Sequence, residues 1–142
     1  MIMKNNIENY VKLFESLNLE NLNKFDELLD KNIYFEDPFN KVYGIENFKR
    51  IFFNTLNKLD NVEFKVLNII SKNNIYIIKW EMIYFAFNKT NSIFGLSEVT
   101  ISENNKIVSH IDYWDSYNNF YTKIPFFGLI FKFVLSYVKK RI

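Results

Sequence analysis

The order of the amphipathic segments is the feature that most restricts the fold of this chain. Three segments near the N-terminus, 7–17, 22–29 and 45–59, repeat apolar residues every three or four positions, as helices with one buried face do. The chain that follows is rich in Val, Ile, Phe, Tyr and Trp, and turns containing Asn or Asp divide it into predicted strands. Helices followed by hairpin-connected strands are typical of an α+β fold.

The predicted strands are a short one at 33–37 and four longer ones at 62–71, 74–87, 93–103 and 107–115. The connections between the longer strands are short, which suits antiparallel neighbours. We therefore expect a strongly curved antiparallel sheet packed on the N-terminal helices. Such a layout leaves a hollow between the two layers, and that hollow is a natural site for a small molecule.

The composition narrows the class of function. With 142 residues the chain is one ordinary domain, and 49% hydrophobic residues suffice for a core and a ring-lined cavity. A net charge of +2 argues against nucleic acid as a partner. The absence of Cys excludes thiolate chemistry, and a single His argues against a metal site. The first six residues lack the apolar core of a secretory signal, so we expect a cytoplasmic location.

Several short motifs resemble one family. They are Tyr10-Val11, the run 34–38 (Tyr-Phe-Glu-Asp-Pro), Gly44-Ile45-Glu46 and the run 106–115 (Lys-Ile-Val-Ser-His-Ile-Asp-Tyr-Trp-Asp). Over about 7–120 the chain resembles the nuclear transport factor 2-like (NTF2-like) superfamily, and more narrowly its SnoaL-like and ketosteroid-isomerase-like branch. The resemblance implies a cone-shaped fold closed by three helices around a deep apolar pocket, with dimers common.

The resemblance also implies catalytic roles. It puts a general base at Asp37 and an oxyanion-binding tyrosine at Tyr10, because ketosteroid isomerases move a proton next to a carbonyl with such groups. A second oxyanion donor falls on Ser97, or on Glu98 if one residue is skipped. Alternation with Val99 favours Ser97 for the inner face.

The last predicted strand carries the only imidazole of the chain. Period-two alternation puts His110, Asp112 and Trp114 on one face, and the family resemblance favours that face for the pocket. A carboxylate two residues from an imidazole lies about 7 Å away along a strand, near enough to share a substrate proton. The alternative is a polar pair at a wet cavity rim. Asp115 is expected to cap a short helix that follows.

The predicted site therefore has two groups of residues. The catalytic candidates are Asp37, Tyr10, His110 and Asp112, and the ligand-binding candidates are Phe14, Phe35, Trp80, Met82, Tyr84, Ser97 and Trp114. We expect a small, apolar ligand of polyketide, terpenoid or steroid type, with no metal and no cofactor. Two classes stay open: an acid–base isomerase, cyclase or hydratase, and a non-catalytic binding or dimerising scaffold.

A C-terminal segment, 124–142, follows the predicted cone domain of 1–123. Pro125 can open a helix, and apolar residues then crowd most of its circumference. A helix over 124–138 would be about 22 Å long, too short for a hydrocarbon core of roughly 30 Å. The segment could cover the pocket mouth, form a dimer contact or lie in a membrane surface. The breadth of the apolar face favours the membrane surface.

Overall fold

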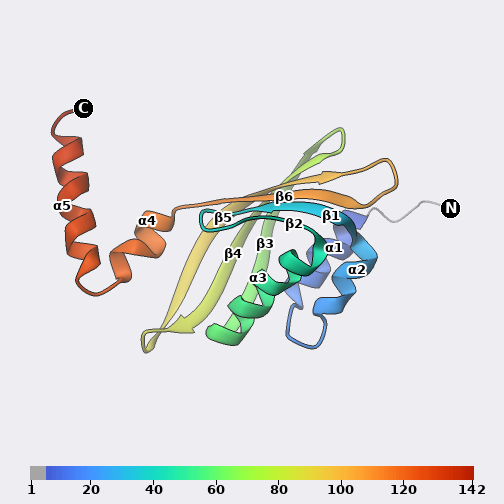
Figure 1. The fold of residues 1–142 in the computed structure, drawn as a ribbon, viewed down its shortest axis with the longest axis horizontal. Helices are drawn as coiled ribbons and strands as arrows, with labels where there is room; N and C mark the ends of the chain where they lie inside the picture. The colour runs from blue at the N-terminus through green and yellow to red at the C-terminus, as the bar shows by residue number, and fades with distance from the viewer. Residues whose placement is uncertain (1–5) are drawn as a thin grey trace.

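Three N-terminal helices cover one face of a curved sheet in the computed structural model, which describes residues 6–142 (Figure 1). The helices are α1 (Asn6–Glu15), the single turn α2 (Phe25–Leu28) and α3 (Ile45–Lys58). A short 3₁₀ turn, η1 (Leu22–Lys24), precedes α2. The fold class is α+β, as predicted.

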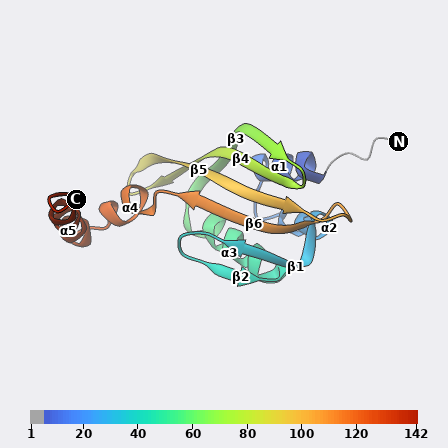
Figure 2. The ribbon, with the colours of Figure 1, turned by 90° about the horizontal axis from the view of Figure 1, so that it is seen from above.

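Six strands form one sheet in the order β2-β1-β6-β5-β4-β3. Their bounds are β1 (Leu29–Glu36), β2 (Lys41–Tyr43), β3 (Asp60–Lys72), β4 (Ile75–Ala86), β5 (Lys89–Ile101) and β6 (Ile107–Trp114). Seen from above, the sheet curves and its two edges do not meet (Figure 2). This curvature leaves room between the sheet and the helices.

The sheet is mixed, which corrects the prediction of a purely antiparallel one. β1 pairs in parallel with β6, and the other neighbours are antiparallel. The pairing joins the first strand of the chain to the last, so no local pattern could show it. β2 was missed because it is only three residues long.

Several element boundaries also differ from the prediction, two of them in an informative way. β5 begins at Lys89 rather than at 93, because Phe87 and Asn88 alone form the turn, with φ values of 55° and 59°. Positive φ at both central residues is the geometry of a tight hairpin turn. The predicted helix 22–29 is two separate turns, and Leu29 already belongs to β1.

The core lies between the helices and the inner face of the sheet. Phe25, Phe35 and Phe48 are fully buried, and the rings of Phe25 and Phe35 both pack against Phe48, with centroids 5.1 and 5.3 Å away. The spacing of Phe48 and Phe52 puts both rings on the inner face of α3. Burying a side chain of this size contributes about 1.5–3 kcal/mol, so this cluster holds α3 against the sheet.

The C-terminal part leaves the sheet and forms α4 (Ser116–Asn119), the 3₁₀ turn η2 (Tyr121–Lys123) and α5 (Phe127–Lys139). Asp115 caps α4 by accepting a hydrogen bond from the backbone N–H of Asn118, which confirms that prediction. α5 lies across one end of the molecule (Figures 1 and 2). Within residues 6–142, no helix is long and apolar enough to cross a bilayer.

Candidate active site

A cavity of about 490 Å³ lies between α1, α3 and the inner face of the sheet. Its wall is predominantly apolar. Every residue predicted for the site contributes to this wall: Tyr10, Phe14, Phe35, Asp37, Trp80, Met82, Tyr84, Ser97, His110, Asp112 and Trp114. Their roles toward a ligand stay predictions.

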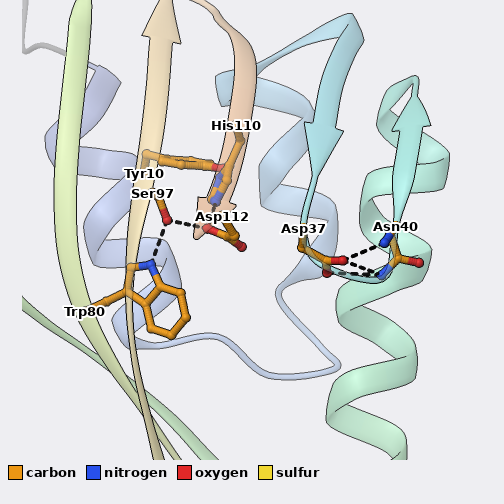
Figure 3. A network of polar contacts seen from close by, with 7 residues as sticks. All are labelled: Tyr10, Asp37, Asn40, Trp80, Ser97, His110 and Asp112. Atoms are coloured by element: carbon orange, nitrogen blue, oxygen red, sulfur yellow. Dashed lines mark hydrogen bonds and ion pairs between the residues drawn. The ribbon is translucent and has the colours of Figure 1, made fainter. Parts of the chain in front are cut away.

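A chain of hydrogen bonds crosses the cavity wall from α1 to β4 (Figure 3). The Tyr10 hydroxyl lies 2.5 Å from His110 Nδ1, and His110 Nε2 lies 2.7 Å from Asp112 Oδ1. Ser97 Oγ donates to the same carboxylate oxygen at 2.5 Å, and Trp80 Nε1 donates to Ser97 Oγ at 2.7 Å. The network therefore joins four separate elements of the fold.

The donors and acceptors of this network determine where its protons lie. The pKa of Tyr10 is raised well above its ordinary value, chiefly because the side chain is buried and secondly because Asp112 is negative. The hydroxyl therefore stays protonated and is able to donate to His110 Nδ1. With Tyr10 as the donor, the imidazole tautomer that carries its proton on Nε2 donates to Asp112, so this tautomer satisfies both bonds.

Local structure explains why these side chains meet. His110 and Asp112 alternate with outward residues along β6, and Ser97 is the cross-strand partner of Asp112. Trp80 is the cross-strand partner of Gly95. The indole packs so closely there that a Cβ on Gly95 would lie 2.3 Å from it. Glycine thus provides the space in which the indole reaches Ser97.

Asp37 lies apart from this network. It follows β1 in the turn to β2, and its Oδ1 accepts hydrogen bonds from the backbone N–H groups of Phe39 and Asn40, both at 2.7 Å. The Asn40 side chain also donates to both carboxylate oxygens at 3.0 Å. Figure 3 shows Asp37 directed toward Asn40 and away from Asp112.

Tyr10 also differs from the expectation, because its hydroxyl is engaged by His110. Ser97 is buried on the inner face of β5, whereas Glu98 follows it on the less buried outer side, as the alternation with Val99 predicts. Ser97 thus belongs to the cavity, as a donor to Asp112.

Other lining residues were not predicted. α3 contributes Ile51, Phe52 and Thr55 to the wall, and β3 contributes Phe64 and Val66. The helical spacing of the α3 residues was a usable signal, since they share the face of Phe48. Within the part of the chain that the structure describes, no group of His, Asp and Glu is arranged to hold a metal ion.

Comparison with known proteins identifies the family of this chain. Residues 4–110 match the model of a family described as an uncharacterized conserved protein family, DUF2358. A search of the curated protein sequences finds no significant match.

Solved structures share the architecture at low sequence identity. An NTF2-like protein of unknown function from Exiguobacterium sp. 255-15 superposes with a TM-score of 0.67 at 13% identity, covering 78% of this chain and 98% of the other. An epoxide hydrolase of M. tuberculosis, described as LEH-like, superposes with a TM-score of 0.65 at 14% identity, covering 81% of this chain and 79% of the other. A protein of Jannaschia sp. CCS1 described as a SnoaL-like polyketide cyclase superposes with a TM-score of 0.64 at 13% identity, covering 78% of this chain and 85% of the other.

The family model covers most of the chain, and the similar structures have the same helices-on-curved-sheet design. The resemblance seen in the motifs is thereby confirmed at the level of fold. The chain belongs to the DUF2358 family, and its fold is the one shared by these NTF2-like and SnoaL-like structures.

Proposed function

We propose that the protein binds a small, predominantly apolar molecule in the cavity and moves a proton on it without a cofactor. The reaction would be an isomerisation, a cyclisation or a hydration, with Asp112 as the base. One observation carries the proposal: the Asp112 carboxylate is held at the wall of an apolar cavity with one oxygen engaged and the other available. Similar structures described as an epoxide hydrolase and as a SnoaL-like polyketide cyclase support this reaction type.

The two oxygens of Asp112 differ in their surroundings. Oδ1 accepts from Ser97 and His110, whereas Oδ2 has no hydrogen-bond partner among residues 6–142. The side chain is 13% exposed, so it is reached from the cavity rather than from bulk water. A carboxylate held by two donors keeps its orientation, and Oδ2 is left to accept a proton.

The proposed reaction needs only the ligand and the carboxylate of Asp112, because the proton that is removed is later returned. Oδ2 of Asp112 takes a proton from a carbon beside a carbonyl, the C–H electron pair moves into a new C=C bond, and the carbonyl oxygen becomes an enolate oxygen. Return of the same proton to another carbon completes an isomerisation. His110 and Tyr10 are positioning residues in this scheme, because they act through Asp112.

Tyr84 is proposed as a contact for the far end of the ligand. It pairs with Asn91, whereas Asp112 pairs with Ser97, so the two side chains are separated by six residues along the strands, about 20 Å. Tyr84 lies on the cavity wall, and burial raises the pKa of its hydroxyl, so the hydroxyl remains protonated and able to donate to a polar group there.

Proton exchange on simple ketones tests the base. A panel of apolar cyclic ketones is incubated with the protein in D₂O, and deuterium incorporation beside the carbonyl is followed by NMR. We expect incorporation to fall by about 10²-fold or more in Asp112→Asn while binding of the ketone persists. Asp37→Asn is the matched control and should retain exchange.

Other outcomes contradict the proposal. If Asp37→Asn abolishes exchange and Asp112→Asn does not, the base is Asp37. If the unaltered protein binds the ketones but catalyses no exchange with any of them, the cavity serves a non-catalytic binding module instead.

A further inference from the structure

The C-terminal segment has a charge pattern unlike the rest of the chain. From Ser116 to Ile142 it holds five basic side chains and no acidic one, whereas residues 1–115 hold 13 basic and 16 acidic side chains. The positive charge of the protein is therefore concentrated at one end. Such a segment is attracted to a negatively charged surface, and the rest of the molecule is not.

α5 within this segment exposes large apolar side chains over most of its surface. Leu129 is 73% exposed and Phe133 is 76% exposed, and further apolar residues around the helix are exposed as well: Phe126, Phe127, Ile130, Val134, Tyr137 and Val138. A soluble domain rarely leaves so large a contiguous apolar surface in water. This surface is therefore a docking face.

The polar side of α5 is turned toward the body of the protein. Lys132, Ser136 and Lys139 form a stripe at helical spacing, and together with Tyr117 of α4 they line a groove between α4 and α5. Most of the apolar side consequently faces away from α4, and only Phe131 at its edge contacts the body, through Tyr121. Folding of α5 over the cavity mouth as a lid would need the opposite orientation.

The position of α5 is set by contacts at its first turn. Gly128 packs on the backbone of η2, since a Cβ there would lie 2.5 Å from the Thr122 carbonyl oxygen. The ring of Phe131 lies 5.2 Å from that of Tyr121. Ring contacts continue from Tyr121 to Phe120, and from Phe120 to Phe39 at the cavity rim.

This position suits a helix that lies flat on a surface. α5 runs across the end of the molecule, roughly perpendicular to its long axis (Figures 1 and 2). With 13 residues it is about 20 Å long, shorter than the roughly 30 Å hydrocarbon core of a bilayer. The exposed rings at the cavity rim, Phe39, Phe87 and Phe120, come from turns on the same side of the molecule as α5.

We infer that α5 docks the protein on the surface of a membrane that contains anionic lipids. The apolar side enters the acyl boundary, and Lys132, Lys139 and Lys140 lie at the level of the lipid phosphates. The cavity mouth then faces the membrane. A second copy of the chain fits this face less well, because two α5 helices would bring together positive charges with no acidic partner. The docking is independent of the chemistry proposed for the cavity.

Vesicle binding tests this inference with the full chain. We expect the protein to sediment with vesicles of phosphatidylcholine and phosphatidylserine in equal parts, and much less with phosphatidylcholine alone or at high salt. Phe133→Asp should lower the partition coefficient about tenfold or more. Ile70→Asp, at an exposed apolar site on the edge strand β3, should leave it unchanged. Lys139→Gln and Lys140→Gln should each lower the partition coefficient about fivefold. Lys72→Gln should leave it unchanged.

The lack of native Cys allows the orientation to be measured as well. A single cysteine introduced by Phe133→Cys and labelled with an environment-sensitive dye should report an apolar environment only when the anionic vesicles are present. The same dye after Ile70→Cys should report water throughout. These results would support docking through α5.

Three outcomes would overturn the inference. The protein could fail to bind the anionic vesicles, or Phe133→Asp could bind as well as the unaltered chain. The dye at position 133 could also report an apolar environment without vesicles, while the protein has the mass of two chains in solution. That last result would assign α5 to a contact between copies of the chain.

Discussion

Trp80 and Gly95 face one another across the β4–β5 pair, and the indole occupies the space that a side chain on Gly95 would need. The close approach brings Trp80 Nε1 within 2.7 Å of Ser97 Oγ, and Ser97 in turn donates to Asp112. A backbone position without a side chain thus determines how one end of the polar network is arranged.

Gly95→Ala is therefore expected to displace the indole. A Cβ at 2.3 Å from Trp80 cannot be accommodated without movement, and overpacking of this kind costs about 1–3 kcal/mol. Urea unfolding measures the loss of stability, and near-ultraviolet circular dichroism reports the displaced ring. Combining Gly95→Ala with Trp80→Phe should recover part of the loss, since the shorter ring leaves space. If Gly95→Ala lowers the free energy of unfolding equally with Trp80 and with Trp80→Phe, the indole is not the group that the new Cβ displaces.

Tyr10→Phe is expected to change how stability depends on alkaline pH. The pKa of Tyr10 is raised in the folded protein by burial and by the Asp112 charge, while in the unfolded chain it is about 10. The native state thus binds the proton more tightly, so the contribution of Tyr10 to the free energy of unfolding is complete below about pH 10. Above that pH the contribution declines by up to ~1.4 kcal/mol per pH unit.

Urea unfolding on both sides of about pH 10 measures this effect. Below that pH, Tyr10→Phe should be the less stable protein by about 1–3 kcal/mol, because His110 Nδ1 loses its buried partner. Above it the difference should shrink, since the variant has no hydroxyl to ionise at this position. A difference that stays constant with pH would contradict the raised pKa.

Phe48→Ala is expected to cost about 3–5 kcal/mol, since the ring is fully buried among Phe25, Phe35 and Phe52. Phe53→Ala on the same helix is the matched control. Its ring is 47% exposed, so the substitution should change the free energy of unfolding by about 0.5 kcal/mol or less. Similar losses for the two variants would contradict the placement of α3.

Asp115→Ala is expected to loosen α4. The side chain accepts a hydrogen bond from the Asn118 N–H at 3.0 Å, and this bond, with the Asn118 side chain, lowers the pKa of Asp115. The cap is therefore present above about pH 4 and is lost as the pH falls through the lowered value. Hydrogen exchange of the Asn118 amide should become about fivefold faster in the variant. Exchange equal to that of the unaltered protein would show that another group caps the helix.

The sequence by itself determined features that depend on neighbours along the chain. Alternation along the last strand placed His110, Asp112 and Trp114 on one face, and the spacing in 45–59 placed Phe48 and Phe52 on the inner side of a helix. The Asp115 cap was predictable for the same reason. Each follows from the period of the element or from a bond spanning three residues.

Only the tertiary structure decided how these faces meet. Tyr10 and His110 are 100 residues apart, and their hydrogen bond requires α1 to pack on the inner face of the sheet. β6 in turn pairs in parallel with β1, a register that no hairpin connection could reveal. Asp37 lies in a motif that predicted a base, yet its carboxylate is bound by Asn40 in its own turn, and Asp112 lies in the network instead. Periodicity shows which way a side chain points within its element, whereas its partner depends on the long-range packing of whole elements.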